Sequence, residues 1–329
     1  MRDLRKPAGI LLAVALLTAL FAGSFIGALH KPAPHDVPIA VVAPEQAVGR
    51  IQTAVDTKAD GAFDLRPYDT EAEARDALAD RDVDAVLIPG PDGHTLLTAG
   101  ASGLAGATII TKVFTAAAQA QGTTLAVTDA HPLSAEDPSG SAMFFYLMSV
   151  LVPSLGGALM LAVGTKLRRF GMLTALTGVA LVVAAVAVSV ADAATGVLPD
   201  STLRLFAVSV LASASIAFPV AGLARLGGAA AGGLAGLLFF PIGIPSSGGP
   251  VGPRYIAEWY GAVGSVLPPG ATLEAVRNAV YFDGAALTGP TLVLGCWIAA
   301  GLLMLVIPKR AKKPAPTTPA TETPVAVHA

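Results

Sequence analysis

The stretch MFFYLMSVLVPSLGGALMLAVGT, residues 143–165, decides the class of fold, because it contains no charged side chain. A helix needs about 20 mostly apolar residues to cross the hydrocarbon core of a bilayer. Further runs along the chain qualify or nearly qualify. The six runs are residues 8–29, 143–165, 172–191, 203–224, 228–244 and 291–307. The sequence therefore predicts a membrane α-helical bundle of six transmembrane helices.

Composition supports a membrane protein. Of the 329 residues, 53% are hydrophobic and 13% are charged, whereas a soluble domain carries about 25% charged residues. The net charge of −2 and the single cysteine exclude a basic nucleic-acid binder and an intrachain disulfide scaffold. We expect the lipid bilayer as a partner and no nucleic acid.

The first apolar run has two interpretations. It follows Arg2, Arg5 and Lys6, as the apolar core of a signal peptide would. The run is longer than a typical signal core, and Ala22-x-Ser24 is its one acceptable cleavage site. The pattern favours an uncleaved transmembrane helix over a cleaved signal peptide.

Charge predicts the orientation. With the N-terminus inside and six crossings, the inner segments hold 11 basic and 2 acidic residues (+9). The outer segments hold 10 basic and 21 acidic residues (−11), which together give the net −2. Lys and Arg beside spans favour the cytoplasmic side. We expect a multi-pass protein of a bacterial cell membrane with both termini cytoplasmic.

Between the first two runs, residues 30–141 predict an inserted extracytoplasmic α/β domain. Short apolar or alternating runs indicate strands, and acidic starts with apolar periodicity indicate helices. The expected strands are 37–42, 63–68, 85–88, 94–98 and 124–128, and the expected helices are 45–58, 71–79 and 104–120. The chain thus divides into residues 1–29, 30–141, 142–307 and a disordered basic cytoplasmic tail, 308–329.

Residues 245–290 predict an external amphipathic or re-entrant segment. Pro268-Pro269-Gly270 turns the chain, and Thr272 is expected to cap a short helix. Leu273, Val276 and Val280 share its apolar face. Arg277 and Asn278 lie to the side, and Tyr281 and Phe282 suit the membrane interface, as do Tyr255, Trp259 and Tyr260. An ordinary surface loop is the alternative.

Gly232 and Gly236 form a G-x-x-x-G pattern, which lets helix backbones approach closely. The pattern favours packing within one bundle, and a seam between subunits is the alternative. The predicted spans hold essentially no ionisable residue at mid-depth, which argues against a carrier driven by a charged relay.

No catalytic motif is recognisable. The chain has no G-x-S-x-G, no H-E-x-x-H and no Gly-Lys-Ser/Thr of a P-loop. We expect no catalytic residue, no metal site, no cofactor and no enzymatic activity in this chain. Any ATP hydrolysis would come from another protein.

The order of one span, a large external α/β domain and five spans resembles the ABC-2-type transporter permeases. Within them it is similar to the phage-infection-protein-like (YhgE/Pip-type) and DUF3533 branches. The residues that carry the likeness are 39–42, 71–74 leading to 85–89, and 267–270 through Arg277-Asn278 to Tyr281-Phe282.

The resemblance implies a permease subunit that works as a homodimer, or as a heterodimer with a similar permease. It would export a lipid, drug or polymer with a separate ATPase subunit. The inner loop with Lys166, Arg168, Arg169 and Phe170 would couple to that ATPase, or its charges would only set topology. The alternative function is a non-transporting scaffold or receptor whose external domain binds envelope partners.

Overall fold

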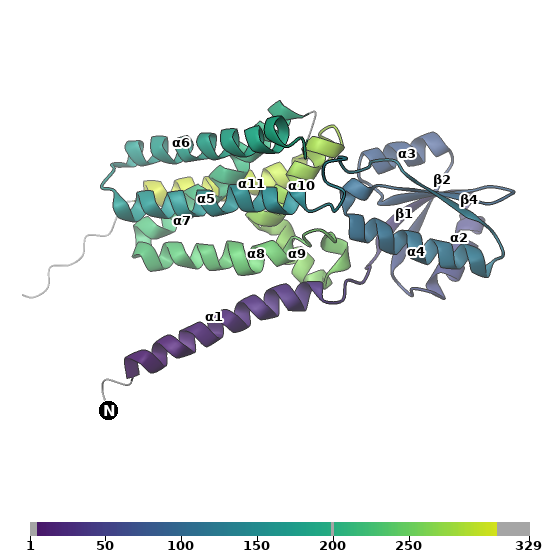
Figure 1. Cartoon of the computed structure of the whole chain (residues 1–329), viewed down its shortest axis with the longest axis horizontal. Helices are drawn as coiled ribbons and strands as arrows, with labels where there is room; N and C mark the ends of the chain where they lie inside the picture. The colour runs from purple at the N-terminus through teal and green to yellow at the C-terminus, as the bar shows by residue number, and fades with distance from the viewer. Residues whose placement is uncertain (1–4, 199–200, 308–329) are drawn as a thin grey trace, which may run out of the picture.

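Apolar helices form most of the protein, and a five-stranded sheet lies at one end of them (Figure 1). The computed structural model describes residues 5–198 and 201–307. Five helical stretches in it are long and apolar enough to cross a membrane. They are α1 (Arg5–Leu29), α5 (Ala142–Gly164), α6 (Arg169–Val188) with the π-helical η2 (Ser189–Ala194), α7 (Thr202–Leu237) continued by η3 (Leu238–Ile242) and α8 (Gly243–Ser246), and α11 (Thr288–Val306). The mostly helical character of the chain is therefore confirmed, and its apolar helices are compatible with a multi-pass membrane protein. The predicted tail, 308–329, lies outside the described residues.

The runs expected as the fourth and fifth spans lie in one stretch, Thr202–Ser246, of 45 residues. As one straight helix it would be about 68 Å long, more than twice the roughly 30 Å thickness of a hydrocarbon core. The stretch is broken at Gly228, whose φ of 79° and ψ of −172° are not helical. In Figure 1 the light-green limb that carries the label α8 runs back along the bundle from this break.

Helix α7 is the centre of the bundle, and polar side chains tie α5 to it. The hydroxyl of Tyr146 lies 2.5 Å from that of Ser209, and the hydroxyl of Ser154 lies 2.6 Å from that of Ser213. Interhelical hydrogen bonds of this kind hold apolar helices together where the hydrophobic effect is weak. Helix α1 contributes little, because it meets η3 and α8 only through its C-terminal half, for example where Phe21 packs on Phe240.

Gly232 and Gly236 face α5 of the same chain, as internal packing requires. A Cβ atom on Gly232 would lie 2.8 Å from the Cβ of Ala224 and 3.0 Å from Cδ1 of Leu159. On Gly236 it would lie 3.3 Å from Cδ1 of Leu155. The missing side chain at Gly232 thus lets the limb after the break pack against the limb before it and against α5.

The sheet contains all five predicted strands, in the order β2-β1-β3-β4-β5. These are β1 (Val37–Val42), β2 (Phe63–Tyr68), β3 (Ala85–Pro89), β4 (His94–Thr98) and β5 (Leu125–Asp129). Strand β1 is parallel to β2 and β3, β3 and β4 form the expected antiparallel pair, and β4 is parallel to β5. We call residues 37–129 the sheet module.

Alternation along the strands gives the sheet module two apolar faces. Ile39 and Val41 lie with Phe114 in one core, which α2 (Glu45–Asp56) and α4 (Leu104–Ala120) cover. Ala40 and Val86 lie in the other, which α3 (Glu71–Ala79) covers. Helix α3 begins as predicted, because the Thr70 side chain accepts a hydrogen bond from the Glu73 amide.

Replacing Gly232 by alanine tests the contact between the two limbs. The new methyl group would overlap Ala224, so we expect the free energy of unfolding to fall by about 1–3 kcal/mol. Gly233→Ala is the matched control, because nothing lies within 4 Å of its Cβ position. It should leave stability unchanged or raise it by up to about 1 kcal/mol. Thermal unfolding in detergent measures both, and equal stability of the two variants would contradict the packing described.

Candidate functional site

The segment before the last apolar helix forms a buried helix, α10 (Pro268–Tyr281). It begins at Pro268 and not after it, because proline fits the first turn of a helix, where its missing amide hydrogen is not needed. Thr272 is therefore not a cap as predicted. It lies inside the helix and is fully buried, and among the described residues its hydroxyl has no hydrogen-bond partner.

Helix α10 is covered on every side, which corrects the surface loop and the surface amphipathic helix, whereas the re-entrant interpretation stays a prediction. It packs against α7, α11, α5 and α9 (Glu258–Val266). The buried residues run almost continuously from Pro268 to Ala279. A Cβ atom on Gly270 would lie 2.2 Å from the carbonyl oxygen of Gly264 in α9, so this glycine permits a close approach. The segment is neither a surface loop nor a surface amphipathic helix.

Arg277 is the largest fully buried side chain, with 1% of its surface exposed. Its Nε donates a hydrogen bond of 3.1 Å to the carbonyl oxygen of Ala101 in the sheet module, and its Nη1 pairs with the carboxylate of Glu274. The other oxygen of Glu274 pairs with Nη2 of Arg81 at 3.1 Å. Helix α10 is thus bonded to the sheet module at two places.

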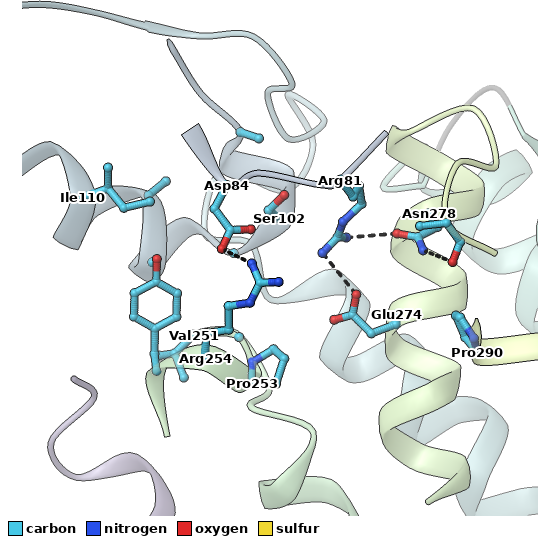
Figure 2. Close-up of a pocket in the computed structure, with 17 residues that line it drawn as sticks. Arg81, Asp84, Ser102, Ile110, Val251, Pro253, Arg254, Glu274, Asn278 and Pro290 are labelled. Atoms are coloured by element: carbon cyan, nitrogen blue, oxygen red, sulfur yellow. Dashed lines mark hydrogen bonds and ion pairs between the residues drawn. The ribbon is translucent and has the colours of Figure 1, made fainter. Parts of the chain in front are cut away.

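Asn278 is a second partner of Arg81 on α10, beside Glu274 (Figure 2). Nη1 of Arg81 donates to Oδ1 of Asn278 at 3.0 Å, and Nδ2 of Asn278 donates to the carbonyl of Ala286 at 3.1 Å. We call Arg81, Glu274, Arg277 and Asn278 the junction network. It joins the turn before β3, helix α10 and the start of the last apolar helix.

The network favours the ionised form of its one carboxylate. Burial alone would raise the pKa of Glu274, but the charges of Arg277 and Arg81 outweigh burial and hold the pKa below its usual range. Burial lowers the pKa of Arg81, and the nearby Glu274 opposes this. Two guanidinium groups share one carboxylate, so removal of Glu274 would leave two largely buried positive charges without an ionic partner.

Two aromatic residues from the bundle side complete the cores of the sheet module. Tyr255 is 5% exposed and lies in the core under α2 and α4. Phe282, just after α10, is 3% exposed and lies in the core under α3. The Arg81 guanidinium lies 4.9 Å from the centroid of the Phe282 ring, and the His131 ring stacks on it at 4.8 Å. Neither ring is therefore exposed as an aromatic residue in contact with lipid would be, and the position of both residues relative to the membrane interface stays a prediction.

Beside the junction network lies a cavity of about 250 Å³, lined from the sheet module, the chain before α9, and α10 (Figure 2). Arg81, Asp84, Arg254 and Glu274 bring four charges to it, and Arg254 pairs with Asp84 at 2.8 Å. Ligand pockets for drug-sized molecules are about 300–1,000 Å³. The cavity is therefore smaller than a site for a drug-sized molecule. In the parts of the chain that the structure describes, no group of His, Cys, Asp or Glu is arranged to hold a metal ion.

The predicted coupling loop to an ATPase lies away from the junction network. Lys166, Arg168, Arg169 and Phe170 are exposed in the α5–α6 connection and the first residues of α6, and Phe170 is 82% exposed. Figure 1 places this connection at the end of the bundle that is opposite the sheet module. Tyr281 is partly buried, and its hydroxyl donates a 3.3 Å hydrogen bond to the carbonyl of Val197.

Sequence reasoning missed Arg81 and Arg254. Arg81 lies among Asp80, Asp82 and Asp84, a run that reads as a solvated turn. Its positive φ of 66° is unusual for a residue other than glycine, but it is visible only in the structure. No local pattern links Arg81 to a helix almost two hundred residues later.

No family model, no curated protein and no solved structure matches the chain. The sheet module, the bundle and the junction network therefore carry the functional argument by themselves.

Arg277→Met tests the junction network. The substitution preserves most of the side-chain volume but leaves Glu274 short of one partner, and breaking a buried pair costs about 3–5 kcal/mol. Arg204→Met is the matched control, because Arg204 pairs with the fully exposed Asp283 and an exposed pair is worth about 0–1 kcal/mol. Unfolding in detergent measures both. Equal stability of Arg277→Met and Arg204→Met would contradict the network.

The lowered pKa of Glu274 predicts a dependence on pH. The stabilisation from its ionised form is present above the ordinary pKa of about 4.5 and is lost as the pH falls through the lowered value. The difference in melting temperature between the wild type and Glu274→Gln should be constant near neutral pH and shrink below about pH 4.5. The exposed Glu45→Gln should show no such change. A difference that grows on acidification would refute the assignment.

Proposed function

We propose that this chain is a permease-like subunit of an ABC-2-type exporter. The bundle crosses a bacterial cell membrane six times, because the chain reverses at Gly228, where the long apolar stretch is broken. The sheet module lies outside and both termini lie in the cytoplasm. The distribution of charge supports this orientation, since the exposed Arg168 and Arg169 lie at the end of the bundle away from the acidic sheet module.

One observation carries the proposal. Helix α10 is buried among the apolar helices and is also bonded to the sheet module through Arg277 and Glu274. A rearrangement of α7 or α11 must therefore move the sheet module or break the junction network. An exporter needs such a link, because its external part has to respond when helices move.

The substrate is a hydrophobic or amphiphilic molecule, such as a lipid, drug or polymer. The apolar helices offer no charged relay for an ion, since the described charged side chains of these helices lie near their ends, as Asp192 and Arg204 do. The energy comes from a separate ATPase subunit that docks at Lys166, Arg168, Arg169 and Phe170. The subunit works as a dimer with itself or with a similar permease.

A second function is favoured by one observation. The connection between α5 and α6 is only residues 165–168, which offers little surface to an ATPase. In this alternative the protein is a non-transporting scaffold or receptor, and the sheet module binds an envelope partner. The junction network would then hold the module at a fixed height above the membrane.

Substitution of the connecting loop separates the two functions. The full chain is purified from membranes of its host, and co-purifying proteins with Walker motifs are identified by mass spectrometry together with vanadate-sensitive ATP hydrolysis. We expect Lys166→Ala, Arg168→Ala and Arg169→Ala combined to lose most of both signals. The variant with Lys166→Arg, Arg168→Lys and Arg169→Lys keeps the charges and should retain them.

Membrane orientation is checked in the same cells. In a Cys296→Ser background, Asp92→Cys in the sheet module should react with an impermeant maleimide in intact cells, with or without the alanine substitutions. Absence of any Walker-motif ATPase from the wild-type preparation would contradict the exporter and favour the receptor. Inverted labelling in the alanine variant would show that the loop only sets topology.

A further inference from the structure

A groove between α5 and α6, on the membrane side of the protein, forms a cavity of about 690 Å³. This volume lies within the range of small-molecule sites, about 300–1,000 Å³. Its walls are mostly apolar: Phe145, Tyr146 and Pro153 stand on α5, and Val182, Val186 and Val190 stand on α6 and η2. We call it the α5–α6 groove. It is distinct from the cavity beside the junction network.

The exposed wall of the groove is a continuous apolar stripe. Val182, Val186 and Val190 are each more than half exposed and repeat every four residues, which places them on one face of the helix. At 1.5 Å per residue the stripe is about 12 Å long. A stripe of this kind along a transmembrane helix matches an extended hydrocarbon chain that lies parallel to the helix.

Both walls depart from regular α-helix at the groove. Pro153 lacks an amide hydrogen, so α5 loses the backbone hydrogen bond to the Ser149 carbonyl, and both residues line the groove. On the other side, Ser189–Ala194 is π-helical, a form that is frequent at functional sites. The two irregularities thus lie on opposite walls of the groove.

The outer mouth of the groove is acidic. Glu136, Asp137 and Ser139 line it, and no Lys, Arg or His stands among the described residues that form the lining. Asp137 is engaged, because its carboxylate accepts hydrogen bonds of 3.0 Å from the amides of Ser141 and Ala142 at the start of α5. Glu136 is exposed and forms no ion pair with another described residue. The mouth therefore complements a cation.

We propose that the α5–α6 groove binds one acyl chain of a membrane phospholipid that carries a primary ammonium head group, as phosphatidylethanolamine does. The chain lies along Val182, Val186 and Val190, and the ammonium group pairs with Glu136. This binding depends on α5 and α6 lying in a membrane. It does not depend on export or on an ATPase.

The amount of lipid that stays bound to the protein tests the groove as the site of the acyl chain. Full-length protein is reconstituted in nanodiscs with equal amounts of phosphatidylethanolamine and phosphatidylglycerol of the same acyl chains, released, and analysed by native mass spectrometry. Val186→Trp fills the groove and should reduce retained phosphatidylethanolamine at least about fivefold. Val182→Phe is a second filling variant in case the first does not insert. Leu181→Trp, exposed on α6 but outside the groove, is the matched control and should retain lipid as the wild type does.

The preference of the protein for one lipid head group over another tests the role of Glu136 at the mouth of the groove. Glu136→Gln should lower the preference for phosphatidylethanolamine over phosphatidylglycerol by about two- to fivefold, as expected for one exposed ion pair. Glu45→Gln in the sheet module should not change it. Equal retention of both lipids by the wild type overturns the assignment of the head group. Equal retention by the filling variants and Leu181→Trp overturns the groove as the site. Cross-linking between two copies through Val186→Cys without retained lipid overturns it as well, because a second copy would then occupy the groove.

Discussion

The buried guanidinium of Arg277 is the constraint on which the rest of the structure depends. A charge with 1% of its surface exposed is stable only where opposite charge and acceptors surround it. Glu274 supplies the charge, and the carbonyl of Ala101 supplies the acceptor. Glu274 in turn requires Arg81. Helix α10, the loop after β4 and the turn before β3 must therefore be in place together.

The sheet module consequently depends on residues from the bundle side to complete its cores. The strands come from residues 37–129, but Tyr255 and Phe282 fill a core on each face of the sheet. These aromatic residues belong to the chain that enters and leaves the α9–α10 pair. A sheet module produced alone would keep α2, α3 and α4 on its faces but would lose the part of each core that Tyr255 and Phe282 fill. The contact is thus structural as well as a route by which helix movement reaches the module.

The sequence predicts best where the signal is local. Strands such as Val37–Val42 show their apolar run or alternation directly, and the cap of α3 at Thr70 is visible as a residue type before acidic residues. The apolar helices follow from composition alone. The reversal at Gly228 is recognisable in the sequence only as a boundary between two runs, because neither its backbone angles nor the contact of Gly232 with Ala224 has a local signal.

The candidate site was predictable only in part. The sequence places Arg277 and Asn278 on a short helix, but its amphipathic pattern is the same whether the helix lies on a surface or inside the bundle. What buries it is contact with the next helix, α11, and with α7 and Arg81, which are more distant in sequence. A single sequence carries no record of such pairs. For the same reason the sequence does not show that Phe282 is buried in the core under α3.

Hydrogen–deuterium exchange of the full-length protein in nanodiscs tests the central claim most directly. If α10 is enclosed between bundle and sheet module, its amides should exchange as slowly as those in the first limb of α7. They should also exchange at least about tenfold more slowly than those of α3, which has an exposed face. Exchange of α10 as fast as that of α3 would show a surface helix and would contradict the account.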